Sequence, residues 1–188
     1  TGERNSALGM NALGATATDI TNSVAVGVNA LYNTTGSSNT AVGDAALYTN
    51  TTGSSNVAVG RNALFLNTTG AENTAVGTYA LDANTTGDDN DAFGVYTLSA
   101  NTTGSKNTAF GRAALGNNTT ADWNIAVGYN ALGANTTGTQ NVAVGGAALE
   151  DCTTGDYNAA FGMEAGRNLT TGDQNTMIGR NAMGGANT

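Results

Sequence analysis

The sequence predicts an all-β fold, a parallel β-solenoid of about eleven coils with 17 residues each. A glycine recurs along the whole chain, and its spacing is 17 residues without exception from Gly43 to Gly179. A short apolar phrase precedes each glycine, and an Asn-Thr-Thr-Gly turn separates most phrases. This unit is too short for a helical-pair repeat or a propeller blade, and glycine, asparagine and threonine are poor helix formers. Residues 1–188 are therefore expected to form a single β-solenoid repeat domain.

The recurring glycine sets the register of the coils. Positions within a coil are numbered here from this glycine, so that +1 is the residue that follows it. The first two intervals are 18 and 16 residues, which indicates one insertion and one compensating deletion. The coil glycines are Gly9, Gly27, Gly43, Gly60, Gly77, Gly94, Gly111, Gly128, Gly145, Gly162 and Gly179.

The phrase before the glycine predicts a β-strand of about five residues in each coil. The residue directly before the glycine is large and apolar in every coil, from Leu8 to Ile178. The residue before that is alanine in ten of the eleven coils, and Met177 is the exception. Equivalent strands would stack about 4.8 Å apart. The constant glycine then marks a backbone position that has no room for a side chain.

Two ladders follow the glycine, where a ladder is the set of residues at one position in successive coils. Position +3 is alanine except at Thr97, and position +4 is leucine except at Gly166 and Met183. Neighbouring strand residues point to opposite faces, so Ala41 and Val42 should face opposite ways. We expect the valine and leucine ladders to fill the coil and at least one alanine ladder to pack against another chain. This predicts a homo-oligomer with cyclic symmetry, and a monomeric solenoid lined with alanine is the alternative.

Asparagine occupies two repeated positions. One asparagine heads nearly every apolar phrase, and stacked asparagines of this kind hydrogen-bond amide to amide along a solenoid. The other begins the turn and forms Asn-Thr-Thr sequons, which are either glycosylation acceptors on an exposed ridge or simply a turn that needs Asn and Thr. The second interpretation is preferred. The sequon asparagines are Asn33, Asn50, Asn67, Asn84, Asn101, Asn118 and Asn135.

Composition argues against several classes of function. The net charge is −8 and Lys106 is the single lysine, so a nucleic-acid partner is not expected. The chain has no histidine, and Cys152 is its only cysteine, so the usual nucleophile–base pairs are missing and no enzyme, cofactor or metal is predicted. No apolar run approaches the roughly 18 residues of a membrane span, so no direct membrane insertion is expected. Cys152 is either a free thiol or meets its symmetry mates.

Two repeated polar features have competing interpretations. The densest acidic cluster is formed by Asp88, Asp89 and Asp91. It is interpreted as a solvated turn, and the alternative is a Ca²⁺ site, although the cluster lacks the ligand spacing of a known calcium loop. The paired threonines of the turns, from Thr34/Thr35 to Thr170/Thr171, resemble the threonine arrays of ice-binding solenoids in that feature alone. The glycine after most pairs favours a turn over a flat strand.

Aromatic residues suggest a place for a ligand. Trp123 and Tyr157 lie at a variable position before the phrase asparagine, where exposed rings stack on sugars or on a partner protein. Tyr32, Tyr48 and Phe65 follow the leucine in three successive coils and are expected to pack locally. The arginines that share position +1 are interpreted as a solvated face: Arg61, Arg112 and Arg180.

The phrase "NSVAVG" at 22–27, with the recurring "NTAVG" and "NVAVG", resembles the head repeat of trimeric autotransporter adhesins. That resemblance implies a left-handed parallel β-roll, an intertwined or side-by-side homotrimer, and display at a bacterial surface. The spacing here is longer than in that family, and no neck, stalk or anchor is visible. The "NTAVG…AL…NTTG" arrays of tail-fibre-like proteins of phages and environmental bacteria are also similar and fit the spacing better.

The expected function is a structural or adhesive rod of an extracellular fibre, at a cell surface or on a virion. It would hold variable turns or a distal tip against a surface glycan or protein ligand. The alternative is a phage tail-fibre shaft or a self-assembling filament segment, and an ice-binding solenoid is the more distant one. The last residues, "GANT", and the first, "TGERNSALG", would together spell a further repeat. The preferred interpretation is that the chain is a segment of a longer fibre, and the alternative is that separate rods stack end to end.

Overall fold

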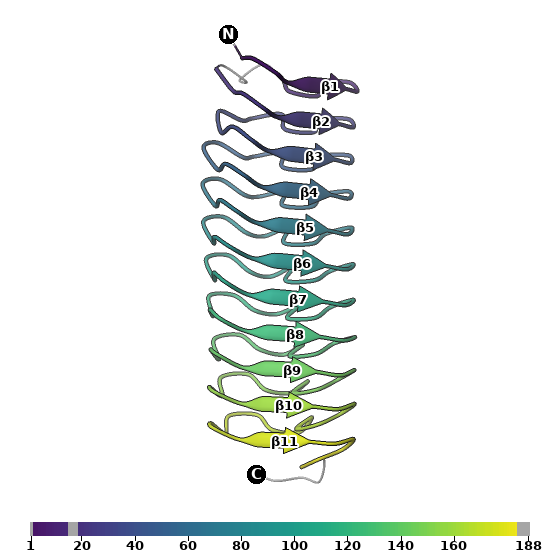
Figure 1. The fold of residues 1–188 in the computed structure, drawn as a ribbon, viewed down its shortest axis with the longest axis vertical. Coiled ribbons are helices and arrows are strands. Elements are labelled where there is room, and N and C mark those ends of the chain that lie inside the picture. Colours follow the sequence, from purple (N-terminus) through teal and green to yellow (C-terminus); the bar gives the residue numbers. More distant parts are fainter. Residues whose placement is uncertain (1, 15–18, 184–188) are drawn as a thin grey trace.

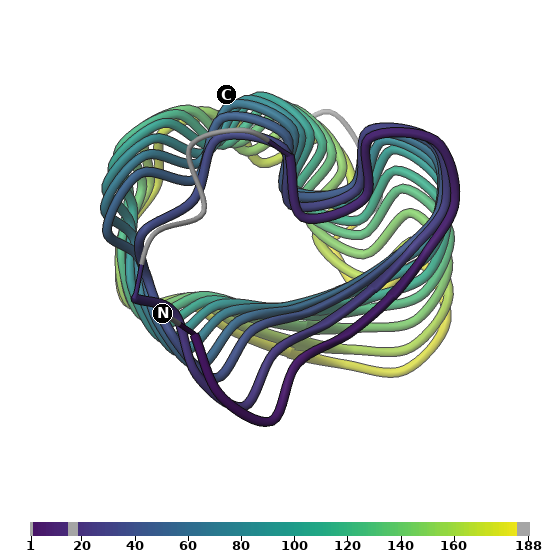
Figure 2. The ribbon, with the colours of Figure 1, turned by 90° about the horizontal axis from the view of Figure 1, so that it is seen from above.

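The computed structural model describes residues 2–14 and 19–183, and in these ranges the chain forms a parallel β-solenoid. Eleven strands form one parallel sheet in sequence order, so ten turns of the solenoid connect the first strand to the last (Figure 1). Seen from the N-terminal end, the chain passes along the strand, turns and returns anticlockwise as it recedes, which makes the winding left-handed (Figure 2). None of the described segments is a helix long and apolar enough to cross a membrane.

Each coil contributes one strand of three residues, which is shorter than the five expected. Register is strict, because the middle residue of each strand pairs with the middle residue of the next strand, as Ala41 does with Ala58. The short strands leave most of each coil to turns. The strands are β1 Ser6–Leu8, β2 Val24–Val26, β3 Thr40–Val42, β4 Val57–Val59, β5 Thr74–Val76, β6 Asp91–Phe93, β7 Thr108–Phe110, β8 Ile125–Val127, β9 Val142–Val144, β10 Ala159–Phe161 and β11 Thr176–Ile178.

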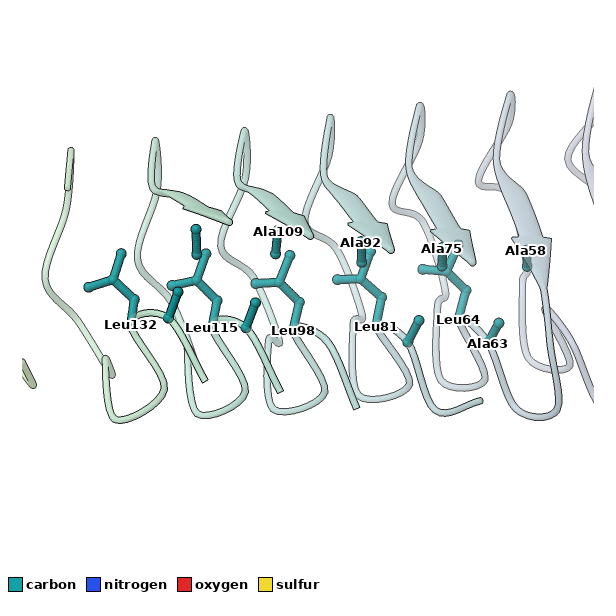
Figure 3. Close-up of a cluster of buried hydrophobic side chains, with 14 of the residues drawn as sticks. Ala58, Ala63, Leu64, Ala75, Leu81, Ala92, Leu98, Ala109, Leu115 and Leu132 are labelled. Carbon is teal, nitrogen blue, oxygen red and sulfur yellow. The ribbon is translucent and has the colours of Figure 1, made fainter. Parts of the chain in front are cut away.

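The interior is filled by the leucine ladder and both alanine ladders, which corrects the expected assignment of faces. Leu64 and the two alanines Ala58 and Ala63 are completely buried, and their equivalents are buried in coil after coil (Figure 3). The strand alanine therefore points inward. The large apolar residue beside it, such as Val42, points outward and stays half-buried. No alanine ladder is left for a second chain.

The narrow cross-section of the coil explains this orientation. The strand side chain points toward the leucine side chain that rises from the opposite side of the coil, as the sticks of Figure 3 show. Close packing leaves space for only a methyl group opposite each leucine. A valine or phenylalanine at the inward strand position would overpack the core.

The coil glycine confirms the expectation of a crowded backbone position. Gly77 has a φ of +141°, and a Cβ placed there would lie 2.3 Å from the carbonyl oxygen of Gly94 in the next coil. Only glycine combines this conformation with so close an approach between two backbones. The turn after the strand is therefore fixed by a contact between coils.

Two departures from the repeat compensate for each other. Gly166 replaces the core leucine of its coil, and Met177 replaces the strand alanine of the next coil. A Cβ at Gly166 would lie 2.5 Å from the Met177 sulfur, so the methionine side chain occupies the volume that a leucine fills elsewhere. Met177 is 1% exposed. The core volume is thus conserved by a pair of changes across adjacent coils.

The proposed junction of the chain ends involves Thr1 and residues 185–188, which lie outside the described residues.

Candidate functional site: the outer faces of the solenoid

The strand face is the outer surface made by the first and last residues of strands β1 to β11. Its last-residue ladder is apolar throughout, and Phe110, Val127 and Phe161 are 43%, 38% and 44% exposed. Phe93 and Phe110 stack along it with ring centroids 4.5 Å apart. Val57 and Ile125 add apolar side chains in the first-residue ladder, at 36% and 41% exposure. The last-residue ladder is therefore a continuous apolar strip parallel to the axis of the solenoid, whereas Ser6, Asp91 and four threonines make the first-residue ladder a mixture of polar and apolar side chains.

The phrase asparagines confirm the expected amide ladder. Each buried amide nitrogen donates to a glycine or alanine carbonyl of the next coil, as Asn73 Nδ2 does to Gly87 O at 2.9 Å. Each side-chain oxygen accepts from the following asparagine, so that Asn73 Oδ1 receives Asn90 N at 3.0 Å and Asn90 Nδ2 at 3.1 Å. Buried polar groups thus satisfy one another along the solenoid.

The turn asparagines form a second buried ladder, so the folded chain does not present most of the sequons. Asn101 Nδ2, the atom that glycosylation would modify, donates to Asn84 Oδ1 at 2.9 Å and to Gly104 O at 2.8 Å. Six of the seven sequon asparagines, Asn50, Asn67, Asn84, Asn101, Asn118 and Asn135, are completely buried, in keeping with the preferred interpretation as turn residues. The shortened second coil differs, because Thr34 occupies the ladder position there and donates no amide, while Asn33 is half-buried.

Cys152 ends the second ladder. It takes the place of the next asparagine, and its thiol lies 3.8 Å from Gly155 O. The buried oxygen Asn135 Oδ1 consequently has no hydrogen-bond partner among the described residues. Burial, with the carboxylates of Asp156 and Asp173 nearby, raises the pKa of the Cys152 thiol. The thiol is free, completely buried and protonated at neutral pH, which makes it unreactive.

The paired threonines do not form a uniform array of hydroxyl groups. In the pairs that begin at Thr51 through Thr153, the first threonine donates its hydroxyl to a carbonyl of the next coil, as Thr85 Oγ1 does to Thr102 O at 2.9 Å. In the shortened second coil the second threonine, Thr35, makes this bond, to Thr51 O at 2.7 Å. The second threonine, such as Thr86, is exposed. One row of threonines therefore supports the turn, and a single row faces solvent.

The acidic cluster does not converge on one point. Asp88 accepts a hydrogen bond from Ala71 N at 2.8 Å, which binds its turn to the preceding coil. Asp91 lies on β6, where its side chain is exposed on the strand face. Within residues 2–14 and 19–183, no group of three or more His, Cys, Asp or Glu residues is placed to hold a metal ion.

The aromatic residues form stacks along the axis. Tyr32 and Tyr48 lie 5.3 Å apart and Tyr48 and Phe65 lie 5.4 Å apart, which confirms that this stripe packs locally. Trp123 is 55% exposed, and the Lys106 ammonium lies 4.4 Å from the centre of its ring. Tyr157 is 56% exposed. Arg61 and Arg112 of the arginine register cover Tyr79 and Tyr129, while Arg180 is exposed.

A hollow of about 490 Å³ lies where the +1 ladder lacks a side chain, and the sequence analysis missed it. Gly146 is the +1 residue of its coil, between Tyr129 and Met163 in the coils before and after it. Ala147, Glu150, Glu164 and Arg167 complete the lining. The signal in the sequence was a glycine at a variable position that otherwise carries a side chain in every coil.

Together, the winding, the strict register and the two asparagine ladders define this chain as a repeat protein of the parallel β-solenoid class. Comparisons with protein-family models, with curated proteins and with solved structures found no match.

Proposed function

We propose that the chain is a structural and adhesive rod of an extracellular fibre, and that it assembles through its strand face into a homotrimer. The observation that carries the proposal is the unbroken apolar ladder on the outer side of the sheet. Over the ten steps of the solenoid the strip extends roughly 50 Å at about 4.8 Å per coil. Soluble monomers rarely expose a contiguous apolar surface of that extent.

The composition of the face supports burial against copies of the same chain. Along β1 to β11, Asp91 is the one charged residue among the outward side chains. A cyclic arrangement brings identical ladders together around one axis, so each coil would meet its own equivalents and the apolar residues would remain in register. The number three comes from the resemblance to the adhesin head repeat, which also suggests a cell surface. A virion fibre shaft is the second setting in which the same rod would serve.

The rigidity of the solenoid suits a mechanical function. Buried ladders of asparagine and leucine extend through most of the described coils, so each coil is bonded to both neighbours. Such a rod holds its variable turns in fixed positions, and three copies would strengthen weak individual contacts through avidity.

The absolute mass in dilute solution tests this proposal. We expect light scattering after size exclusion to give three times the chain mass of 18.6 kDa. Phe110→Lys should lower that mass, because three buried ammonium groups would meet near the axis. Leu66→Lys is the matched control, since Leu66 is 43% exposed, like Phe110, but lies at position +6, outside the strand face. A parent chain of one-chain mass would contradict the proposal.

A further inference from the structure

The strongest unassigned feature is the interruption of the +1 ladder at Gly146. A Cβ added to Gly146 would meet nothing within 4 Å, and Gly146 does not have a positive φ. Tyr129 on one side is 59% exposed, and Met163 on the other side is 52% exposed. These two side chains are two coils apart, about 9.6 Å at about 4.8 Å per coil. A ring bound midway would lie about 4.8 Å from each of them, which is the spacing of successive coils.

The stacking pattern of the molecule indicates what would fit there. Wherever aromatic residues share a ladder position in successive coils, their rings stack, as Tyr79 and Tyr96 do at 5.2 Å with an angle of 1° between planes. Tyr129 is covered on the side of the preceding coil, where the Arg112 guanidinium lies 5.8 Å from the centre of its ring. Gly146 leaves the side of Tyr129 toward Met163 without a side chain. A ring supplied from outside would continue the stack.

The rim of the hollow selects among rings. Glu150 accepts a hydrogen bond from Asn130 Nδ2 and pairs with Arg167 Nε at 2.7 Å. Arg167 Nη1 also lies 3.6 Å from Glu164 Oε1, so two carboxylates share one guanidinium and the rim has a net charge of −1. These groups accept and donate hydrogen bonds at the edge of the ring site. A purely apolar ring would remove the water that these groups bind and would offer no hydrogen bonds in its place.

We propose that the hollow is a binding site for one pyranose ring of a neutral or amino sugar. The C–H face of the sugar would pack on Tyr129, opposite Met163, and its hydroxyl groups would bond to Glu164 and Arg167, while the Glu150 carboxylate holds Arg167 in place. An acidic sugar would be repelled by the negative rim. The choice of a sugar as the ligand rests on the adhesive function proposed above. The geometry of the hollow is independent of that function. A surface glycan would then bind to the rod at the coil of Gly146.

Saturation-transfer NMR with methyl β-D-glucopyranoside as the probe tests this site on the assembled protein. We expect transfer to the sugar ring protons in the parent chain and at least a fivefold loss in Gly146→Tyr, whose new ring would fill the hollow. Thr78→Tyr is the matched control, because it places the same side chain at position +1 of another coil and should leave the transfer unchanged. Tyr129→Ala should reduce the transfer as strongly as Gly146→Tyr does.

Two further probes decide the ligand class. Methyl β-D-glucuronide should show at least threefold weaker transfer than the neutral glucoside, and p-cresol should not compete with the sugar. Equal sugar signals in the parent and Gly146→Tyr, or binding of p-cresol alone, would overturn the proposal. The mass of the same samples keeps the two proposals separate. A trimer without sugar binding refutes the site alone, and a monomer that binds sugar at Gly146 refutes the assembly alone.

Discussion

At the scale of single residues, the solenoid depends on amides that bond along the axis. Asn118 Nδ2 donates to Asn101 Oδ1 at 2.9 Å, and Asn135 Nδ2 donates to Asn118 Oδ1 at 2.9 Å. The next residue of the ladder, Cys152, has no amide, so Asn135 Oδ1 remains buried without a donor. A buried unsatisfied acceptor costs about 1 to 3 kcal/mol.

Cys152→Asn should therefore stabilise the chain. The new amide would donate to Asn135 Oδ1 and to Gly155 O, and asparagine is close to cysteine in volume. We expect the free energy of unfolding in urea to rise by about 1 kcal/mol. Cys152→Ala is the control, since it leaves Asn135 Oδ1 without a donor and should give no rise. Equal stability of the two variants would show that the ladder oxygen is satisfied in another way.

Asp82 gives the stability a dependence on pH. Its side chain follows the Tyr32–Tyr48–Phe65 stripe at the same position, and burial raises its pKa although its own backbone N–H lowers it somewhat. Below about pH 3.9, the ordinary pKa of aspartate in an unfolded chain, Asp82 is protonated in both the folded and the unfolded state and does not reduce stability. As the pH rises through the folded pKa, the partly buried group must ionise and stability is lost.

Asp82→Asn should consequently raise the thermal midpoint at pH 7 and have a smaller effect at pH 3. Thermal unfolding followed by circular dichroism at both pH values measures the difference. Asp44→Asn, at an exposed +1 position, is the control for a general change in net charge. A stabilisation of the same size at both pH values would contradict the assigned cause.

At the scale of the coil, the stability of one element depends on the next. The strand position holds an alanine because a leucine fills the space opposite it, and the last two coils replace this leucine and alanine with Gly166 and Met177. Each change alone leaves the core with the wrong volume. Together they restore it, which is why the repeat tolerates two departures in adjacent coils.

A double-mutant cycle tests this coupling. Met177→Ala should cost about 2 to 5 kcal/mol through the cavity it leaves. Gly166→Leu alone should also destabilise, since its Cβ would lie 2.5 Å from the Met177 sulfur. The double variant recreates the ordinary coil and should lie within about 1 kcal/mol of the parent in urea unfolding, which implies strong coupling. Additive losses would mean that the two sites are independent.

At the scale of the whole molecule, the strand face is the surface through which we propose that three chains associate. Asp91 would place one carboxylate from each chain near the common axis, where like charges oppose assembly. Asp91→Thr should therefore strengthen the trimer at least tenfold, as measured by sedimentation over a dilution series. Asp89→Asn removes an exposed carboxyl outside the strand face, suits the φ of +56° at that position, and should leave the dissociation constant unchanged. Equal effects of both changes would indicate a general charge effect instead.

The sequence alone determined the architecture of this protein. The glycine spacing established the coils, and the repeated asparagines predicted the amide ladder, because a position that sees the same neighbours in every coil keeps the same residue. The sequence also predicted that the side chains of Ala41 and Val42 point to opposite faces of the strand. It did not determine which of these faces lies inside, and the prediction on that point was wrong.

Only the tertiary structure decided toward which face of the strand each coil closes, and so which face lies inside. That direction depends on the turn after the strand, where residues such as Ala45 and Leu47 adopt φ values of +53° and +51°. Alanine and leucine give no sign of this left-handed conformation, which is costly for them and is imposed by contacts between coils. The same closure buried the sequon asparagines and exposed the Val/Phe ladder. It also left the hollow at Gly146, because a missing side chain forms a site only when its neighbours are stacked.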